Sequence, residues 1–172
     1  EPLQGEVMVY PLSQHIGAPA KPLVAKGDHV LKGQIIAEAG GFIFANVLSS
    51  VSGTVKGIES KLVANGAMVQ SILVENDGEE EAIEGFGTDR DASKLSKEET
   101  RQIVKDAGIV GLGGAGFPTH VKLTPKDENA IDYVIVNGAE CEPYLTSDYR
   151  TMIERPEQTI GGLKVLLQLL DN

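Results

Sequence analysis

The chain lacks features that several common classes of protein require. It contains one cysteine, Cys141, among 172 residues, so a disulfide framework within the chain and an all-cysteine iron–sulfur site are both excluded. Lysine and arginine number 15 against 25 aspartate and glutamate residues, which gives a formal net charge of -10. This acidic balance argues against nucleic acid and against an anionic membrane surface as direct partners.

Long apolar runs and clustered metal ligands are also missing. No stretch approaches the ~20 apolar residues that a helix needs to span a bilayer, so we expect no direct membrane insertion. No second histidine or cysteine lies at ligand spacing from His15 or His29, and we assign no metal. We also assign no catalytic residue, because the acidic neighbours of Cys141 disfavour a thiolate there.

The first 78 residues have the pattern of an all-β domain. Short β-branched or alternating runs, separated by Gly, Asp and Asn turn signals, predict strands at residues 6–10, 34–39, 53–58 and 69–75. This spacing is typical of a small barrel or sandwich. The sequence LVAKGDHVLKGQ at residues 23–34, with SGTV at residues 52–55, is similar to biotinyl and lipoyl carrier domains.

Those carrier domains present a modifiable lysine on a hairpin at their midpoint. The midpoint here reads GGFIF at residues 40–44 and has no lysine, so we expect the fold without the carrier function. Phe42 and Phe44 either form an exposed docking pair or fill the barrel or pack on the next domain. We favour packing.

The second half mixes helix signals with an apolar strand pattern. Residues 79–95 are acidic and glycine-spaced, and we interpret them as a linker between domains at residues 1–78 and 96–172. Ser96 and Glu99 form a capping box that predicts a helix start, and Gly108 suits the left-handed position after its end. Pro156 suits the first turn of a final helix. Its expected apolar face comprises Ile160, Leu163, Leu166, Leu167 and Leu170.

Two neighbouring stretches carry the candidate site. Residues 111–122 read GLGGAGFPTHVK, with four glycines in six residues. The N–H groups of such a loop can cradle a phosphate, and Lys122 adds a positive charge. The second stretch begins with an apolar run, residues 131–136, that predicts a strand buried on both faces.

The apolar run ends abruptly in Asn137, Glu140 and Glu142. Ligands of open α/β sheets bind beyond the carboxyl ends of strands, so this is the expected place for such a polar cluster. The plain alternative is that both stretches are ordinary turns. Because an acidic cluster at a strand end accompanies the glycine loop, we interpret the two stretches as walls of one nucleotide-type site.

These motifs resemble those of a known family. GLGGAGFPTHVKL and VIVNGAECEPYLTSDYRTM, together with HIGAPAKP at residues 15–22, resemble the C subunit of the Rnf electron-transport complex. The chain is similar, more distantly, to the NADH-binding flavoprotein subunit of respiratory complex I. The resemblance implies a mixed α+β chain: an N-terminal barrel-sandwich domain, then the first part of an α/β FMN- and NADH-binding domain.

The resemblance also implies residue roles. FMN would be held by Gly111, Gly113, Gly114, Gly116, Lys122, Asn137 and Glu140, with Cys141 as a further candidate contact. Phe117 and Glu142 would lie against NADH. The sequence departs from the complex I pattern at Leu112, where those relatives carry an arginine, and at Ala139, where they carry an aspartate. Both changes remove charged groups near the expected flavin.

The implied whole is a peripheral subunit on the cytoplasmic face of the bacterial cell membrane. Its complex couples electron flow between ferredoxin and NAD to ion transport, so its partners are NADH, other subunits and, indirectly, ferredoxin. The chain has no initiator methionine and stops just after an apolar helical pattern, so we expect a fragment of a longer subunit. The 4Fe-4S clusters and the rest of the flavin pocket would lie in the missing part, and the chain alone would bind FMN or NADH weakly and be inactive.

Two alternatives remain open at this point. The chain also fits a non-catalytic docking module, in which a carrier-like barrel is fused to half an α/β domain. The other alternative is a paralogous subunit, similar to a cobalamin reductase or to the A subunit of a sodium-pumping quinone reductase, and only the closeness of the motifs to the Rnf form distinguishes these.

Overall fold

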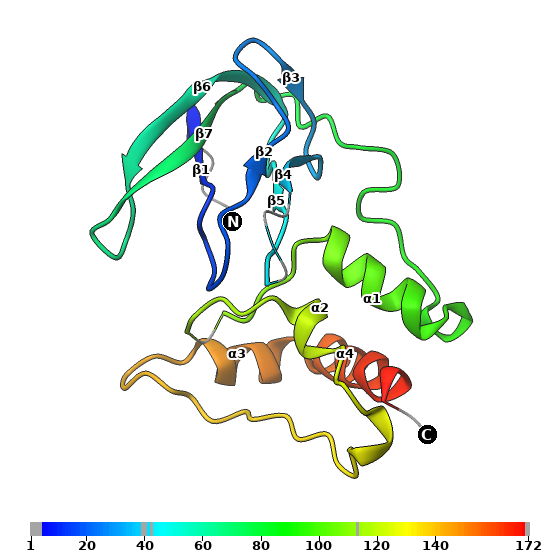
Figure 1. Cartoon of the computed structure of the whole chain (residues 1–172). Helices are drawn as coiled ribbons and strands as arrows, with labels where there is room; N and C mark the ends of the chain where they lie inside the picture. The colour runs from blue at the N-terminus through cyan, green and yellow to red at the C-terminus, as the bar shows by residue number, and fades with distance from the viewer. Residues whose placement is uncertain (1–4, 39–40, 42, 113, 171–172) are drawn as a thin grey trace. The chain divides into compact units, whose positions relative to one another are not determined.

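The structure is a computed structural model that describes residues 5–38, 41, 43–112 and 114–170 (Figure 1). The chain divides into two compact units. The first comprises Glu1–Asp89 with Ile103–Thr119, and the second comprises Arg90–Gln102 with His120–Asn172. The domain limits expected from the sequence, 1–78, 79–95 and 96–172, stay a prediction.

The first unit contains two antiparallel sheets. One sheet has the order β1 (Val7–Pro11), β7 (Met68–Asn76), β6 (Gly53–Leu62) and β3 (His29–Val30). The other has the order β2 (Lys21–Pro22), β4 (Ile35–Glu38) and β5 (Val47–Leu48). Figure 1 shows β6 and β7 as one long hairpin with β1 beside β7. The four strands expected from the sequence are confirmed.

One hydrophobic cluster receives side chains from both sheets. The four-stranded sheet contributes Tyr10, Val30, Val55, Ile72 and Val74, and the other sheet contributes Ile36, Ala37 and Val47. Along the start of β6, Gly53 and Val55 are buried whereas Thr54 and Lys56 are exposed, as the period of two in a strand requires. The two sheets therefore enclose a common core, and the expected barrel-sandwich fold is confirmed.

The first part of the acidic segment lies on this sandwich. The Lys32 N–H donates to the Glu81 carbonyl at 2.8 Å, and the Ile83 N–H donates to the Lys32 carbonyl at 3.0 Å. The Lys32 ammonium lies 5.9 Å from the centre of the Phe86 ring. Residues 81–86 are thus fixed to the barrel, although their composition is that of a linker.

The second unit is built from helices and connecting segments. Its elements are η1 (Ala92–Lys94), the first part of α1 (Lys97–Asp106), most of α2 (Thr119–Lys122), η2 (Glu128–Ala130), α3 (Ser147–Glu154) and α4 (Pro156–Leu169). The capping box is confirmed: the Glu99 N–H donates to Ser96 Oγ at 3.2 Å, and the Ser96 N–H donates to Glu99 Oε2 at 2.8 Å. Pro156 occupies the first turn of α4, as expected. Across the part of the chain that the structure describes, no helix combines the length and apolar character needed to cross a bilayer.

The expected strand at residues 131–136 is wrong for this structure. The segment is irregular, and Tyr133 and Ile135 are 83% and 86% exposed. A buried strand needs neighbours to satisfy its N–H and C=O groups. No strand is present among the described residues of the second unit, so this apolar run has nothing to pair with.

The burial of α4 also differs from its expected apolar face. Ile160 and Leu167 are 53% and 47% exposed, whereas Leu169 is only 1% exposed. The other three residues of that face, Leu163, Leu166 and Leu170, are partly buried. Helical spacing identified an apolar helix correctly, but within this unit only Leu169, near its C-terminal end, is fully buried.

Arg101 joins the elements around that buried end. Its Nε donates to the Leu123 carbonyl at 2.8 Å, and its Nη2 donates to the Leu169 carbonyl at 3.3 Å. The same Nη2 pairs with the Glu128 carboxylate, which Lys97 also contacts at 3.1 Å. The hydrogen bonds from Lys97 and then Arg101 hold the pKa of Glu128 below its usual value. One guanidinium thus ties α1 to η2 and to the end of α4.

We expect Arg101→Lys to lower the free energy of unfolding of the second unit by about 1–3 kcal/mol, because a lysine cannot reproduce the planar fork. Arg150→Lys is the matched control, since Arg150 is 61% exposed and contacts only the Glu154 carboxylate among the pairs described. Its expected effect is within about 0.5 kcal/mol. Denaturant titration checks both values, and equal effects of the two variants would contradict this account of Arg101.

Candidate functional site

The glycine-rich stretch folds as a narrow loop with a closed neck. The Gly111 N–H donates to the Phe117 carbonyl at 2.9 Å, and the Thr119 N–H donates to the Ile109 carbonyl at 2.9 Å. These two hydrogen bonds bring the two ends of the loop together, and residues 112–116 form the loop between them. Gly113 lies outside the described residues.

The start of this loop is fixed by the end of α1. Gly108 has φ of +62°, the left-handed conformation expected from the sequence. A Cβ at Gly108 would lie 2.5 Å from the Asn46 carbonyl oxygen and 2.8 Å from Leu48 Cδ1. Beside it, the Lys105 ammonium lies 5.3 Å from the centre of the half-buried Phe44 ring. The favoured packing role is thus supported for Phe44, while Phe42 lies outside the described residues.

The far side of the loop is held by residues from the start of the barrel. The Ile16 N–H donates to the Ala115 carbonyl at 2.8 Å. Gly116 has φ of +62°, and a Cβ there would lie 2.9 Å from the Gln14 carbonyl oxygen and 3.1 Å from His15 Cα. Backbone thus meets backbone at this point, and only a glycine permits the approach.

The remaining side of the loop is open. Leu112 is 95% exposed, and a Cβ added at Gly114 would meet no atom within 4 Å. Residues 109–119 contain no aspartate or glutamate, in a chain whose net charge is -10. A glycine loop without acidic side chains, anchored on one side and open on the other, fits an anionic group such as a phosphate.

Phe117 and Lys122 follow the loop in the chain. Phe117 is half-buried, and its carbonyl closes the neck. Lys122 is the last residue of α2, and its side chain is exposed. It belongs to the second unit, together with the second candidate stretch.

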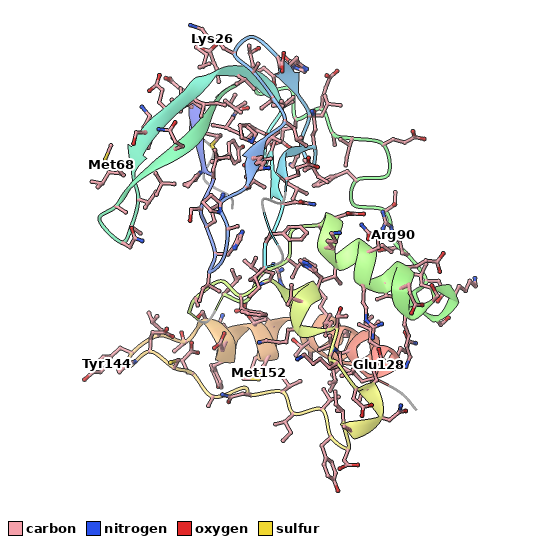
Figure 2. The ribbon with its side chains drawn as sticks, in the orientation of Figure 1. Lys26, Met68, Arg90, Glu128, Tyr144 and Met152 are labelled. Atoms are coloured by element: carbon pink, nitrogen blue, oxygen red, sulfur yellow. The ribbon has the colours of Figure 1, made fainter. Side chains whose placement is uncertain are left out.

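The second stretch lies along α3 within the second unit. Asn137 is exposed, and its Oδ1 accepts a hydrogen bond from the Ala139 N–H at 3.0 Å. A Cβ at Gly138 would lie 3.0 Å from Met152 Sδ of α3. Figure 2 shows Met152 on this helix and Tyr144 at the outer end of the loop that leads to it. The polar residues after position 136 therefore follow an irregular segment rather than a strand end.

Glu140 has a structural role that the sequence did not suggest. Its carboxylate accepts hydrogen bonds from Ser147 Oγ at 3.1 Å, the Asp148 N–H at 3.0 Å and the Tyr149 N–H at 3.2 Å. Thr146 stands at the N-cap of α3 without a side-chain cap. Glu140 thus caps α3 from outside the helix, where a negative charge also favours the helix dipole.

Cys141 and Glu142 complete the set predicted from the sequence. Both are exposed, and Cys141 is a free thiol. The Glu142 carbonyl accepts a hydrogen bond from the Leu145 N–H at 3.3 Å, which forms the turn before α3. Asn137, Glu140, Cys141 and Glu142 are therefore neighbours within the second unit, whereas the glycines and Phe117 belong to the first. The expected meeting of the two stretches in one hollow stays a prediction.

The comparisons with known proteins match the two parts of the chain separately. Residues 2–79 match the RnfC barrel sandwich hybrid domain, and residues 104–172 match the Nuo51 FMN-binding domain. The chain is 45% identical over 170 residues to the C subunit of a proton-translocating ferredoxin:NAD(+) oxidoreductase complex of Clostridium ljungdahlii. That match covers 99% of this chain and 37% of the relative.

The chain thus joins an RnfC barrel sandwich hybrid domain to a segment of the Nuo51 FMN-binding domain.

Further relatives agree. The C subunit of a Na(+)-translocating ferredoxin:NAD(+) oxidoreductase complex of Acetobacterium woodii is 45% identical over 168 residues, covering 95% of this chain and 37% of that protein. The C subunit of an ion-translocating oxidoreductase complex of Pseudomonas aeruginosa is 41% identical over 169 residues, covering 94% of this chain and 21% of the relative. The chain thus spans between 21% and 37% of the length of these three proteins.

The close approach at Gly116 leads to a test of the loop's anchoring. We expect Gly116→Ala to destabilise the first unit more than Gly66→Ala, because Gly66 shares the positive φ, +83°, but has open space around its Cβ position. The backbone conformation alone costs about 1–2 kcal/mol in each variant. Unfolding free energies measured by denaturant titration give the difference, and an equal loss would show that the Gln14–His15 backbone does not restrict Gly116.

Proposed function

We propose that this chain is the part of an NADH- and FMN-binding subunit that carries the barrel and one portion of the nucleotide site. The complex would transfer electrons between NAD(H) and iron–sulfur centres and couple that transfer to ion transport. Support comes from the Nuo51 FMN-binding domain match over residues 104–172 and from the names of the relatives. The single observation that carries the proposal is the closed-neck glycine loop, open on one side and free of acidic residues, within that matched segment.

The loop would hold the flavin phosphate. Gly111 would contribute by closing the neck through its own N–H, the backbone N–H groups of Gly113, Gly114 and Gly116 would be the donors, and Lys122 would supply the positive charge. The anchoring described above means that these donors need little reorganisation when a phosphate binds, which favours affinity. When bound there, FMN would supply the redox chemistry that links a two-electron hydride donor to one-electron acceptors, and the loop and Lys122 would hold its phosphate.

The second stretch would contact the rest of the two nucleotides. Asn137, Glu140 and Cys141 are proposed to contact FMN, while Phe117 and Glu142 would orient the nicotinamide. Hydride transfer depends mainly on alignment, so these side chains act by positioning rather than by proton transfer. Glu140 is already oriented by three hydrogen bonds at the start of α3. These bonds fix the orientation of the carboxylate, so less side-chain freedom would be lost when a ligand donates to a remaining lone pair.

The proposed setting follows the relatives' names. The partners would be NADH, the other subunits of a membrane electron-transport complex and, indirectly, ferredoxin. The subunit would be peripheral, on the cytoplasmic face of the bacterial cell membrane. The 4Fe-4S clusters are proposed to lie in the portion of the subunit that the relatives have and these 172 residues do not include.

A docking module is the second candidate, and the exposed apolar side chains of the second unit favour it. Tyr133 and Ile135 are 83% and 86% exposed, and apolar side chains exposed together on a surface mark sites of protein–protein contact. A docking module would bind another subunit but no flavin. Flavin binding in a longer polypeptide therefore separates the two candidates.

The test uses a chimaera in which these 172 residues replace the matching segment of the Clostridium ljungdahlii subunit. We expect it to bind FMN and to be reduced by NADH, whereas the 172-residue chain alone binds FMN weakly or not at all. Lys122→Ala in the chimaera should weaken FMN binding about 10–100-fold, the loss of one charge-assisted hydrogen bond. Flavin fluorescence titration measures both proteins.

Lys126→Ala is the matched control, since Lys126 is another lysine close in the chain. Glu140→Gln retains an oxygen acceptor but removes the charge, and we expect a smaller loss of affinity. If Lys122→Ala and Glu140→Gln both leave the flavin content unchanged, the site assignment is wrong. Tight stoichiometric binding by the 172-residue chain would refute the expectation that it is insufficient.

A further inference from the structure

The His15 ring makes two hydrogen bonds to backbone groups, and their directions define its tautomer. The Ala45 N–H lies 3.0 Å from Nε2, and the Ile16 carbonyl oxygen lies 2.9 Å from Nδ1. A backbone N–H can only donate, so Nε2 accepts. A carbonyl can only accept, so Nδ1 carries the hydrogen and donates. The ring is therefore a neutral imidazole that bridges two backbone segments.

Both ends of this bridge matter for the glycine loop. Ile16, whose carbonyl receives the His15 Nδ1–H, uses its own N–H to hold the Ala115 carbonyl at 2.8 Å. Ala45 is 3% exposed and lies just before β5. His15 thus ties Ile16 to the buried Ala45 before β5, and Ile16 in turn holds the loop.

The half-buried His15 ring borders two hollows. A hollow of about 430 Å³ lies on one side, lined by His15, Gln14, Asn65 and Ala115 among others. A second hollow of about 300 Å³ is lined by His15, Ala45, Asn46 and Gly108 among others. The ring borders open space on these sides, and its two hydrogen-bonding nitrogens are the contacts that join it to Ile16 and Ala45.

We propose that His15 is a positioning residue for the glycine loop, and that the barrel therefore serves as the base on which the nucleotide-binding loop is built. His15 touches no ligand in this proposal. It acts through Ile16, whose hydrogen bond to Ala115 sets where the N–H groups of residues 111–116 lie. The identity of the ligand rests on the proposed function, whereas the positioning of the loop does not.

The first arm of the test uses the 172-residue chain and amide hydrogen exchange measured by NMR. We expect His15→Phe to speed exchange at Ile16, Ala45 and the loop amides by about tenfold, because one or two net hydrogen bonds are lost. The amides of Val55 and Ile72 in the barrel core should keep their protection. His15→Gln has an acceptor oxygen and a donor nitrogen, and it should restore most of the slow exchange.

The control is the other barrel histidine. His29 Nε2 lies 3.1 Å from Asp77 Oδ2, and the His29 side chain is 50% exposed. His29→Phe should leave the exchange of Ile16, Ala45 and the loop unchanged. If His15→Phe does not fold, His15→Gln and His15→Asn are compared in its place, because Asn cannot reach Ala45 as Nε2 does.

The second arm measures FMN affinity in the chimaera. We expect His15→Phe to weaken FMN binding about tenfold, with partial recovery in His15→Gln and no change in His29→Phe. The proposal is overturned if loop exchange is unchanged, or if His15→Phe leaves FMN affinity unchanged while Lys122→Ala weakens it. If the parent chimaera binds no FMN, the proposed function fails, and the exchange arm alone decides whether His15 positions the loop.

Discussion

The central constraint on the first unit is that a loop made largely of glycine cannot hold its own shape. Glycine has the greatest conformational freedom of any residue, and it offers no side chain for packing. Three backbone contacts restrain the loop: the close approach at Gly108, the hydrogen bond between Gly111 and Phe117, and the hydrogen bond at Ala115. Two of these three contacts come from the barrel, so the fold of the N-terminal sheets and the geometry of the loop are parts of one arrangement.

The second unit depends on a different kind of restraint. Its helices share a small buried centre at Leu123 and Leu169. The apolar area buried there stabilises the unit only slightly. Arg101 compensates by satisfying carbonyl groups from two separated segments while its charge is matched by Glu128. The apolar run at residues 131–136 remains outside this centre. The second unit thus depends on directed hydrogen bonds and ion pairs, whereas the barrel depends on a packed apolar core.

Local patterns in the sequence predicted the elements well, and long-range pairing set the limit. The capping box at Ser96, the left-handed Gly108 and the strands of the long hairpin depend on neighbours within a few residues or on alternation, and all three are confirmed. The strand at 131–136 needed a partner strand that no local pattern reveals. The role of His15 depends on a hydrogen bond to Ala45, 30 residues away. The motif HIGAPAKP, which begins at His15, does not reveal that partner. The capping of α3 by Glu140 was missed because the acid lies well before the helix rather than at its N-cap.

The Glu140 carboxylate couples the stability of the first turn of α3 to the binding of any ligand that contacts the same carboxylate. Its oxygens already satisfy the first N–H groups of the helix, and the N-cap residue of that helix provides no side-chain cap. A molecule that keeps this carboxylate in its present orientation would stabilise the first turn of α3, whereas one that competes for its lone pairs would destabilise that turn. Because such coupling is reciprocal, anything that frays α3 would change the affinity of that molecule by the same factor.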